Sequence, residues 1–187
     1  MPTVELIPDG NNSYGTLWQY DYTAVDEGSS SPNDSDYIRS AVNNRKEFFN
    51  FTTSTDLDGK TISKIDFYYR AKKASNGGFI PQLYIGGTAY DGTTPTLTTS
   101  YANYYSTWTT NPADSAAWEK SDIDGLVAGF KVDIPRGIGN WAYVSNTWII
   151  VTYVSAGYGN DVIGVASGDI SIINGVATAN ISKVNGV

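Results

Sequence analysis

The sequence contains neither cysteine nor histidine in its 187 residues. Without these two residue types the chain can build no Ser-His-Asp triad, no thiol nucleophile, no haem-histidine ligation and no ordinary Cys/His zinc site. No disulfide can hold the fold, so its stability must come from a hydrophobic core, from subunit contacts or from a hard cation. The two absences therefore exclude several of the commonest catalytic and metal-binding classes.

Charge is also scarce, and the charge that is present is mostly negative. Charged residues make up 17% of the chain, and 19 Asp and Glu outnumber 12 Lys and Arg to give a net charge of −7. An acidic surface repels phosphate, so we expect no nucleic-acid partner.

Long apolar runs are missing as well. No stretch approaches the ~20 apolar residues of a membrane-spanning helix, so we expect no membrane partner. Residues 1–5 have neither the basic region nor the apolar stretch of a signal peptide, which predicts synthesis in the cytoplasm without secretion.

The residues that are abundant favour strands and tight turns. The chain has 14 Tyr, 5 Trp and 19 Gly, with much Thr, Val, Ile, Asn and Ser. Apolar and polar residues alternate in Ile62–Lys72, which predicts a strand with one buried face, and Ile62 is out of phase, which predicts a bulge or the entry of the strand there. Trp141–Val154 is apolar on both faces and is typical of a central strand. We predict an all-β, antiparallel, jelly-roll-like β-sandwich of eight to ten strands, with one short helix in Ala116–Leu126.

A short unit is repeated at the end of the chain. Residues 170–176 read Ile-Ser-Ile-Ile-Asn-Gly-Val and residues 181–187 read Ile-Ser-Lys-Val-Asn-Gly-Val. Each copy is a β-prone run that contains Asn-Gly, the pair that best forms a two-residue hairpin turn. A unit of this size cannot bury a face alone, so it must pack on the main domain, a neighbouring subunit or a larger surface.

These observations predict a sandwich domain over residues 1–156 and a C-terminal β-hairpin arm for assembly over residues 157–187. The alternative is an ordinary final hairpin that completes a sheet. The residues predicted to carry assembly are Ile170, Ile172, Asn174, Gly175, Val176, Ile181, Val184, Asn185, Gly186 and Val187.

An acidic loop occupies residues 26–36 and is called the acidic loop below. Asp26, Asp34 and Asp36 supply hard oxygen ligands, and the alternate spacing of Asp34 and Asp36 occurs in many Ca²⁺ loops. The segment lacks the full EF-hand pattern, and solvated surface loops often have the same composition. We expect no obligatory cofactor, and Ca²⁺ at this loop is the one metal hypothesis.

Aromatic residues cluster in the second half of the chain. Stacked Tyr and Trp rings can bind the apolar faces of sugar rings, while hydroxyl groups are hydrogen-bonded at the rim. The same residues also suit a core or a subunit interface. The candidate sugar-binding residues are Tyr101, Tyr104, Tyr105, Trp108 and Trp118.

Glycoside hydrolysis needs two carboxylates at a fixed separation, and any two of the 19 Asp and Glu residues could supply them. No pair stands out by its position in the predicted strands. We therefore predict no catalytic residues and no enzyme, with a glycosidase or lyase as the last-ranked hypothesis.

Three segments resemble accessory virion proteins of tailed bacteriophages. They are the opening Pro2–Pro8 with Asp36-Tyr37-Ile38, the middle Thr61–Ala71 with Leu97–Tyr101 and Trp108-x-x-Asn111-Pro112, and the repeated Ile-Ser-Lys-Val-Asn-Gly-Val tail. The resemblance spans most of the chain and implies a capsid decoration, head-fibre or tail-accessory role. It implies no catalytic residues.

On this basis the first functional hypothesis is a structural protein of a phage virion, most simply a capsid decoration or cement protein attached through its terminal arms. The expected partners are copies of itself, in a homo-oligomer such as a trimer, and phage capsid or tail proteins, and the expected location is the virion. The alternative is a carbohydrate-binding module, free or tail-borne, that stacks Tyr and Trp on a glycan such as one of the host surface.

Overall fold

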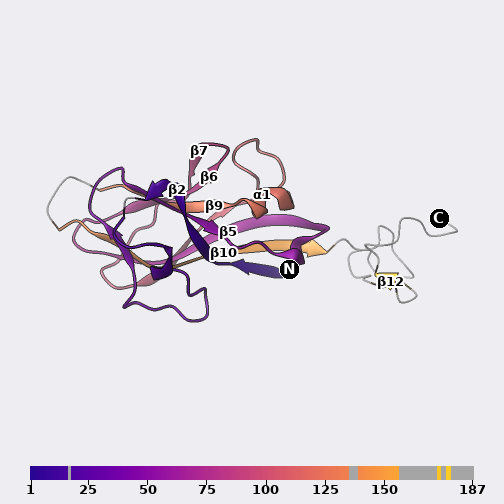
Figure 1. The fold of residues 1–187 in the computed structure, drawn as a ribbon, viewed down its shortest axis with the longest axis horizontal. Helices are drawn as coiled ribbons and strands as arrows, with labels where there is room; N and C mark the ends of the chain where they lie inside the picture. The colour runs from indigo at the N-terminus through magenta and orange to yellow at the C-terminus, as the bar shows by residue number, and fades with distance from the viewer. Residues whose placement is uncertain (17, 135–138, 156–171, 174–175, 178–187) are drawn as a thin grey trace.

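The protein is an antiparallel β-sandwich, seen edge-on in the computed structural model (Figure 1). The structure describes residues 1–16, 18–134, 139–155, 172–173 and 176–177. One sheet, sheet A, has the order β1 (Thr3–Leu6), β10 (Ala142–Ser155), β5 (Lys60–Lys73), β8 (Ala102–Trp108), and β3 (Ile38–Ser40) also pairs with β10. The other, sheet B, has the order β2 (Pro8–Thr16), β4 (Lys46–Phe51), β9 (Val127–Val132), β6 (Phe79–Ile85), β7 (Thr88–Asp91).

The core lies between the two sheets and is rich in aromatic rings. On β5 the alternate residues Ile65, Phe67 and Tyr69 are fully buried, as the sequence pattern predicts. Phe130 of β9 packs across the interface on Phe67, with ring centroids 5.3 Å apart, and within sheet B on Phe79 of β6, 4.7 Å apart. Tilted and edge-to-face rings of this kind hold the sheets together through apolar burial and quadrupole attraction.

Two strand predictions are confirmed in detail. β10 is central, because β5 pairs along its whole length on one side while β1 and β3 share the other side. The irregularity predicted at Ile62 is a register shift, since Tyr153 pairs with Ile62 while the adjacent Thr152 pairs with Lys64.

Helical structure is shorter than the sequence pattern indicates. The helix predicted within Ala116–Leu126 is the single turn α1 (Lys120–Asp124), where the Asp122 side chain accepts a hydrogen bond from the backbone N–H of Glu119 at 2.9 Å. The described residues also form two 3₁₀ turns, η1 (Tyr22–Ala24) and η2 (Thr55–Leu57). No helix among the described residues is long and apolar enough to cross a membrane.

At the C-terminal repeat, β11 (Ile172–Ile173) pairs antiparallel with β12 (Val176–Ala177). This pairing agrees with the hairpin predicted for the first copy. The other predicted assembly residues, Ile170, Asn174, Gly175, Ile181, Val184, Asn185, Gly186 and Val187, lie outside the described residues. Their role in assembly and the domain boundary at residue 156 stay predictions.

Candidate functional site

The five aromatic residues predicted to bind sugar do not form one surface. β8 places successive side chains on opposite faces, so Tyr104 packs inward on Tyr69, with ring centroids 6.0 Å apart, while Tyr105 points outward and is 57% exposed. Trp118 is buried, and its indole N–H donates to the backbone carbonyl of Trp108 at 3.1 Å. Tyr104 and Trp118 therefore pack toward the core, which leaves little of either ring for a sugar, and their part in sugar binding stays a prediction.

The outer face of sheet A carries an aromatic row, Trp148–Tyr68–Tyr105, on three adjacent strands. Tyr68 is stacked on Trp148 at 5.3 Å with an interplanar angle of 8°, and Tyr105 lies 5.1 Å from Tyr68 on the other side. Beside the row, the Lys64 ammonium lies 2.7 Å from the Asp66 carboxylate. That hydrogen bond raises the pKa of Lys64 and keeps its charge paired.

The other cations on this face are also held by groups of the same chain. Arg70 donates to both oxygens of Asp34, from Nε at 2.7 Å and from Nη2 at 2.6 Å. Lys72 lies 4.3 Å from the centroid of Tyr101, which has the position of a cation–π contact. Burial raises the pKa of the Tyr101 hydroxyl, so this ring stays neutral beside the two cations.

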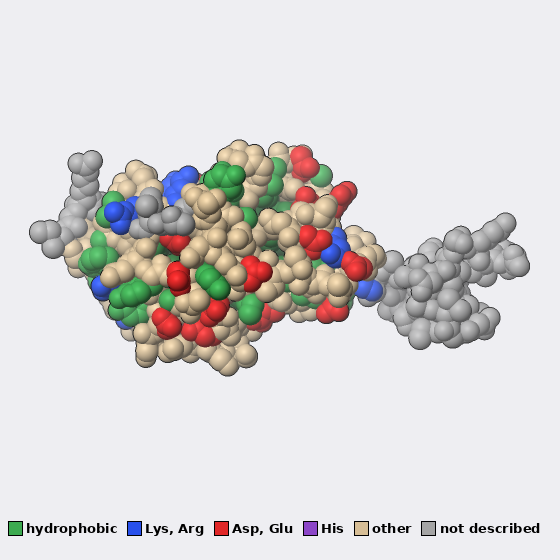
Figure 2. All heavy atoms as spheres, viewed as in Figure 1, with side chains coloured by type: hydrophobic (Ala, Val, Ile, Leu, Met, Phe, Trp, Pro, Cys, Tyr) green, Lys and Arg blue, Asp and Glu red, His purple; other side chains and the backbone are tan. Residues whose placement is uncertain are grey.

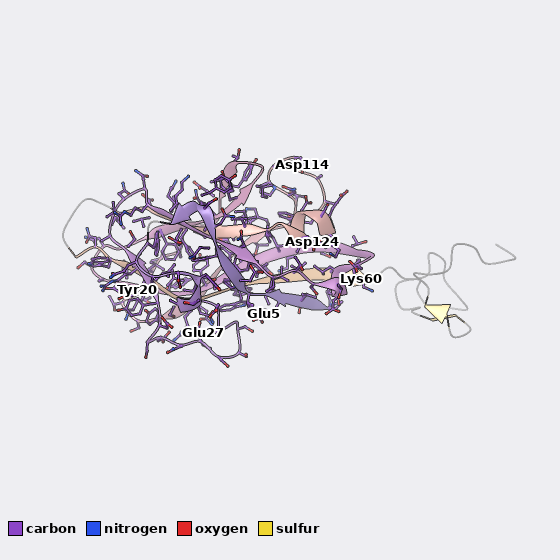
Figure 3. All side chains as sticks on the ribbon, in the orientation of Figure 1. Glu5, Tyr20, Glu27, Lys60, Asp114 and Asp124 are labelled. Atoms are coloured by element: carbon purple, nitrogen blue, oxygen red, sulfur yellow. The ribbon has the colours of Figure 1, made fainter. Side chains whose placement is uncertain are left out.

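The acidic loop packs across β10, and its Asp34 carboxylate has a structural role. Asp34 accepts from Ser145 at 2.9 Å as well as from Arg70, and the Arg70 hydrogen bond, the strongest influence, lowers the pKa of the Asp34 carboxyl. The Asn146 side chain donates to the backbone carbonyl of Gly28, and Ser29 donates its N–H to Glu5 at 2.7 Å. Figure 3 shows Glu5 and Glu27 on the same side of the sandwich.

The structure gives the predicted Ca²⁺ site at Asp26, Asp34 and Asp36 no support. No group of three His, Cys, Asp or Glu side chains suited to a metal occurs anywhere in the described ranges. The physical reason at Asp34 is its engagement with Arg70, which removes both of its oxygens from the loop interior. Of the neighbouring carboxylates, Glu27 has a raised pKa because burial disfavours its charge, and the charges of Asp26 and Asp36 act in the same direction.

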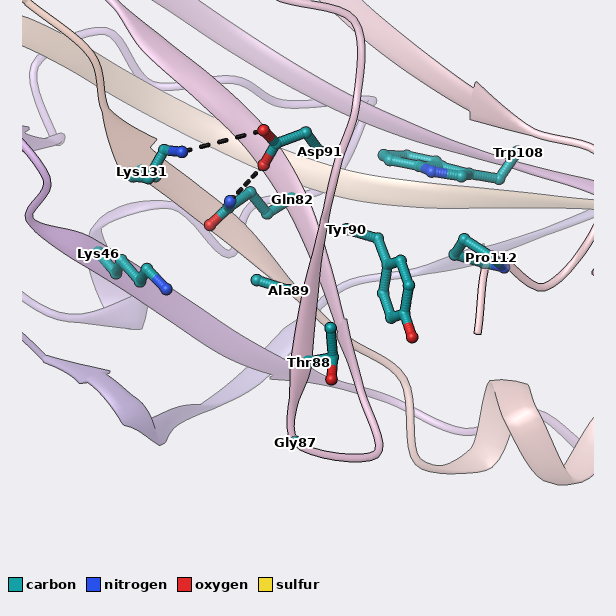
Figure 4. Close-up of a pocket in the computed structure, with 10 residues that line it drawn as sticks. All are labelled: Lys46, Gln82, Gly87, Thr88, Ala89, Tyr90, Asp91, Trp108, Pro112 and Lys131. Carbon is teal, nitrogen blue, oxygen red and sulfur yellow. Dashed lines mark hydrogen bonds and ion pairs between the residues drawn. The ribbon is translucent and has the colours of Figure 1, made fainter. Parts of the chain in front are cut away.

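A second surface, at the edge of sheet B, has a different character. A groove of about 700 Å³ runs along edge strand β7 and is called the β7 groove below (Figure 4). Its position follows from the β6–β7 hairpin, whose two-residue turn is Gly86-Gly87 with φ of +57° and +89°. Positive φ at both central residues is the geometry that matches the twist of a tight hairpin, and glycine adopts it without strain.

One flank of the β7 groove is aromatic. It consists of Tyr90, Trp108 and Pro112, and Figure 4 shows the rings of Tyr90 and Trp108 on the same side of β7. Gly92 fixes Trp108, because a Cβ at Gly92 would lie 2.8 Å from the ring atom Cη2. Pro112 follows Asn111, which is buried and whose side chain accepts from the N–H of Ala113 at 2.9 Å. The flank is therefore apolar, with Trp108 packed close against Gly92.

The opposite flank is polar and belongs to the outer face of sheet B. Gln82 of β6 and Asp91 of β7 are paired in register, and the Gln82 amide nitrogen donates to the Asp91 carboxylate. Lys131 of β9 lies 3.9 Å from the other Asp91 oxygen, and Lys46 of β4 stands opposite Lys131 in the ladder. Dashed lines in Figure 4 mark the two Asp91 interactions.

The carbonyl oxygen of Gln82 is buried and has no hydrogen-bond partner within the described part of the chain. In Figure 4 it is directed toward the side of the groove that carries Lys46 and Lys131. A buried acceptor without a donor costs roughly 1–3 kcal/mol, so such groups normally have a partner. A donor from a ligand would remove this cost.

Sequence reasoning identified Trp108 but missed the other residues of this groove. Asp91-Gly92 reads as a turn, and Lys46 reads as part of the small basic pair Arg45-Lys46. Their convergence depends on the ladder that joins β4, β9, β6 and β7, strands that are far apart in the sequence. The one usable signal is the outward phase of Lys131 in its strand.

Comparison with known proteins gives matches only among solved structures. No family model matches the chain, and no curated protein matches it. The C-terminal family 6 carbohydrate-binding module of LamC, a marine laminarinase of Zobellia galactanivorans, is 14% identical, with 81% of this chain and 100% of that chain covered and a TM-score of 0.44.

A family 29 carbohydrate-binding module from Piromyces equi is 10% identical, with coverage of 81% and 93% and a TM-score of 0.42. A family 4 module, CBM4, is 13% identical, with coverage of 80% and 88% and a TM-score of 0.34. At such identities the likeness concerns the β-sandwich fold alone.

The predicted role as a phage virion protein that decorates the capsid is wrong on this comparison. The three neighbours are carbohydrate-binding modules, the class of the alternative hypothesis, and none of the three is a virion protein. The comparison does not support the phage partners expected from that role, and the virion location stays an untested prediction. The Tyr-rich strands and the Asn-Gly turns that suggested this role occur in many β-sandwiches regardless of function.

Proposed function

We propose that this chain is a non-catalytic carbohydrate-binding protein whose ligand lies in the β7 groove. The observation that carries the proposal is the placement of the Tyr90 and Trp108 rings across β7 from the polar groups of Gln82, Asp91 and Lys131. Sugar rings have apolar faces and hydroxyl edges, so a binding site needs an aromatic surface and hydrogen-bonding groups within one ligand's reach.

The groove suits a chain of sugar units. It is open along an edge strand whose side chains are short at Gly87, Thr88 and Ala89, so an extended ligand can cross the strand without obstruction. One sugar would stack on the aromatic flank while its neighbour bonds the polar flank. The acceptors are Asp91 and the unpartnered Gln82 carbonyl, and the donors are the lysine ammonium groups.

The small number of carboxylates in the groove favours binding over hydrolysis. Among the described residues that line it, Asp91 is the sole carboxylate. Glycosidases of the common mechanisms use a pair of carboxylates on either side of the scissile bond, and Asp91 is already engaged with Gln82 and Lys131.

The test is calorimetric titration of the full chain with a panel of neutral and acidic oligosaccharides, repeated with two Tyr variants. Tyr90→Ala should lower the affinity for any bound glycan about 10-fold or more, because it removes half of the aromatic flank. Tyr105→Ala removes an exposed ring of the same type from sheet A and should change the affinity less than 2-fold. Binding that Tyr105→Ala abolishes and Tyr90→Ala leaves intact would place the ligand on the other sheet.

A further inference from the structure

Two lysines face each other inside the β7 groove. Lys46 and Lys131 occupy directly opposite positions of the antiparallel β4–β9 ladder, and both line the groove. Like charges at directly opposite positions destabilise a sheet. The pair is positive, whereas the molecule has a net charge of −7. Figure 2 shows more Asp and Glu than Lys and Arg on the face in view.

The chain compensates this positive charge only in part. Lys131 has Asp91 at 3.9 Å, a long contact, and Asp91 also accepts the Gln82 amide. The Lys46 side chain makes no hydrogen bond or ion pair within the ranges that the structure describes. On sheet A, by contrast, Lys64 and Arg70 each have a carboxylate within 2.7 Å. The β7 groove therefore holds one positive charge more than it neutralises.

We infer that the glycan bound in the β7 groove is acidic, with its anionic group between Lys46 and Lys131. This inference rests on the proposed function and specifies its ligand. The anion is the carboxylate of a uronic acid or a sulfate ester, both of which accept charge-assisted hydrogen bonds from ammonium groups. Binding would relieve the repulsion between the two lysines, while the apolar faces of the sugar rings stack on Tyr90 and Trp108.

The first experiment compares acidic and neutral ligands, and it includes one pair, oligogalacturonate and its methyl ester, that differs only at the carboxylate. Calorimetric titration uses oligogalacturonate, its fully methyl-esterified form, a sulfated carrageenan oligosaccharide and neutral cello-, laminari- and xylo-oligosaccharides. We expect an acidic member to bind at least about 10-fold more tightly than any neutral one, with an affinity that falls at high salt. Preference for oligogalacturonate over its ester identifies a carboxylate, and preference for the carrageenan identifies a sulfate.

The second experiment changes the protein. The double variant Lys46→Gln/Lys131→Gln should lower the affinity for the acidic ligand about 10-fold or more. The control Lys60→Gln/Lys73→Gln, which removes two positive charges from β5 of sheet A, should leave it within 2-fold. Asp91→Asn should raise this affinity several-fold, because it removes the carboxylate that competes for Lys131 while an amide oxygen still accepts from Gln82. Structural damage would not produce effects of opposite sign.

The outcomes separate this inference from the proposed function. Binding of neutral oligosaccharides that Tyr90→Ala weakens and the double lysine variant leaves unchanged would overturn the acidic ligand and keep the groove as a sugar site. Absence of binding to every member of the panel would reject the proposed function, and the acidic-ligand inference with it.

Discussion

The outer face of sheet A and the β7 groove both place aromatic rings beside charged side chains, yet they differ in how far those groups are already partnered. On sheet A, Trp148 and Tyr68 are stacked, Lys64 is bound to Asp66, and Arg70 is bound to Asp34. In the groove, the Gln82 carbonyl accepts no hydrogen bond from the described residues, and the lysine pair is only partly neutralised.

The difference teaches that aromatic content alone does not identify a binding surface. A polar group that is fully bonded within the chain contributes to stability and has little left for a ligand. A group that is held in place but remains unbonded keeps its capacity for a ligand. On sheet A, Lys64 and Arg70 are each bound to a carboxylate, whereas the β7 groove keeps one positive charge more than its described carboxylate neutralises, and for this reason we propose the groove as the binding site.

Removal of Trp108 should have the largest effect on binding. Trp108→Ala deletes the larger ring of the aromatic flank and should lower glycan affinity about 30-fold, since a central Trp contact contributes about 2 kcal/mol or more. Titration of the bound oligosaccharide measures the loss. Trp108→Phe is the matched control, because it keeps an apolar ring near the core and should recover most of the affinity. Equal, unchanged affinities for both variants would remove Trp108 from the site.

Removal of Tyr68 should separate stability from binding. Tyr68→Ala breaks the row between Trp148 and Tyr105 and should lower the free energy of unfolding by about 1–2 kcal/mol, from lost stacking and burial. Urea denaturation measures the stability, and glycan titration of the same sample should show less than a 2-fold change. A large loss of affinity in a folded Tyr68→Ala protein would contradict the structural role of sheet A.

A methyl group at Gly92 should disturb the groove from beneath. Gly92→Ala places Cβ 2.7 Å from the Ser106 hydroxyl and 2.8 Å from the Trp108 ring, so the ring must move. We expect about a 5-fold loss of glycan affinity, roughly 1 kcal/mol. Gly125→Ala is the control, since no atom lies within 4 Å of its Cβ position. A full-affinity Gly92→Ala protein would show that the ring position is not critical.

The smallest expected effect concerns pH and the acidic loop. Because Arg70 lowers the pKa of Asp34 below its unfolded value of about 3.9, the pair stabilises the fold at pH values above that range, and this stabilisation disappears as pH falls through the folded pKa. Asp34 is partly exposed, so Asp34→Asn should cost only about 0.5–1 kcal/mol at neutral pH and nothing in strong acid.

Thermal unfolding across this pH range measures the Asp34 effect. Asp26→Asn, in the same loop, removes a carboxylate that makes no hydrogen bond or ion pair in the described part of the chain. It should not change the stability at neutral pH or in strong acid. A constant Asp34→Asn penalty down to strong acid would mean that the Arg70 ion pair is not its source.

Local patterns predicted the sandwich well because each depends on neighbouring residues. Alternation over Ile62–Lys72 identified the buried face of β5, and the two-sided apolar run identified central β10. The clustering of Tyr104, Tyr105 and Trp108 in sequence was misleading for the same reason, since a strand sends adjacent side chains to opposite faces. The polar flank could not be predicted, because Lys46, Lys131 and Gln82 meet only through strand pairings between distant segments.

The most direct test of the account is a nuclear magnetic resonance titration of the isotope-labelled chain with the tightest-binding oligosaccharide of the panel. If the glycan lies in the β7 groove, the resonances of the Gln82 side-chain amide, the Trp108 indole N–H and the backbone amides of β7 shift, while those of Tyr68 and Tyr105 stay in place. Shifts confined to β5 and β8 on the outer face of sheet A, with Gln82 and β7 unperturbed, would contradict it.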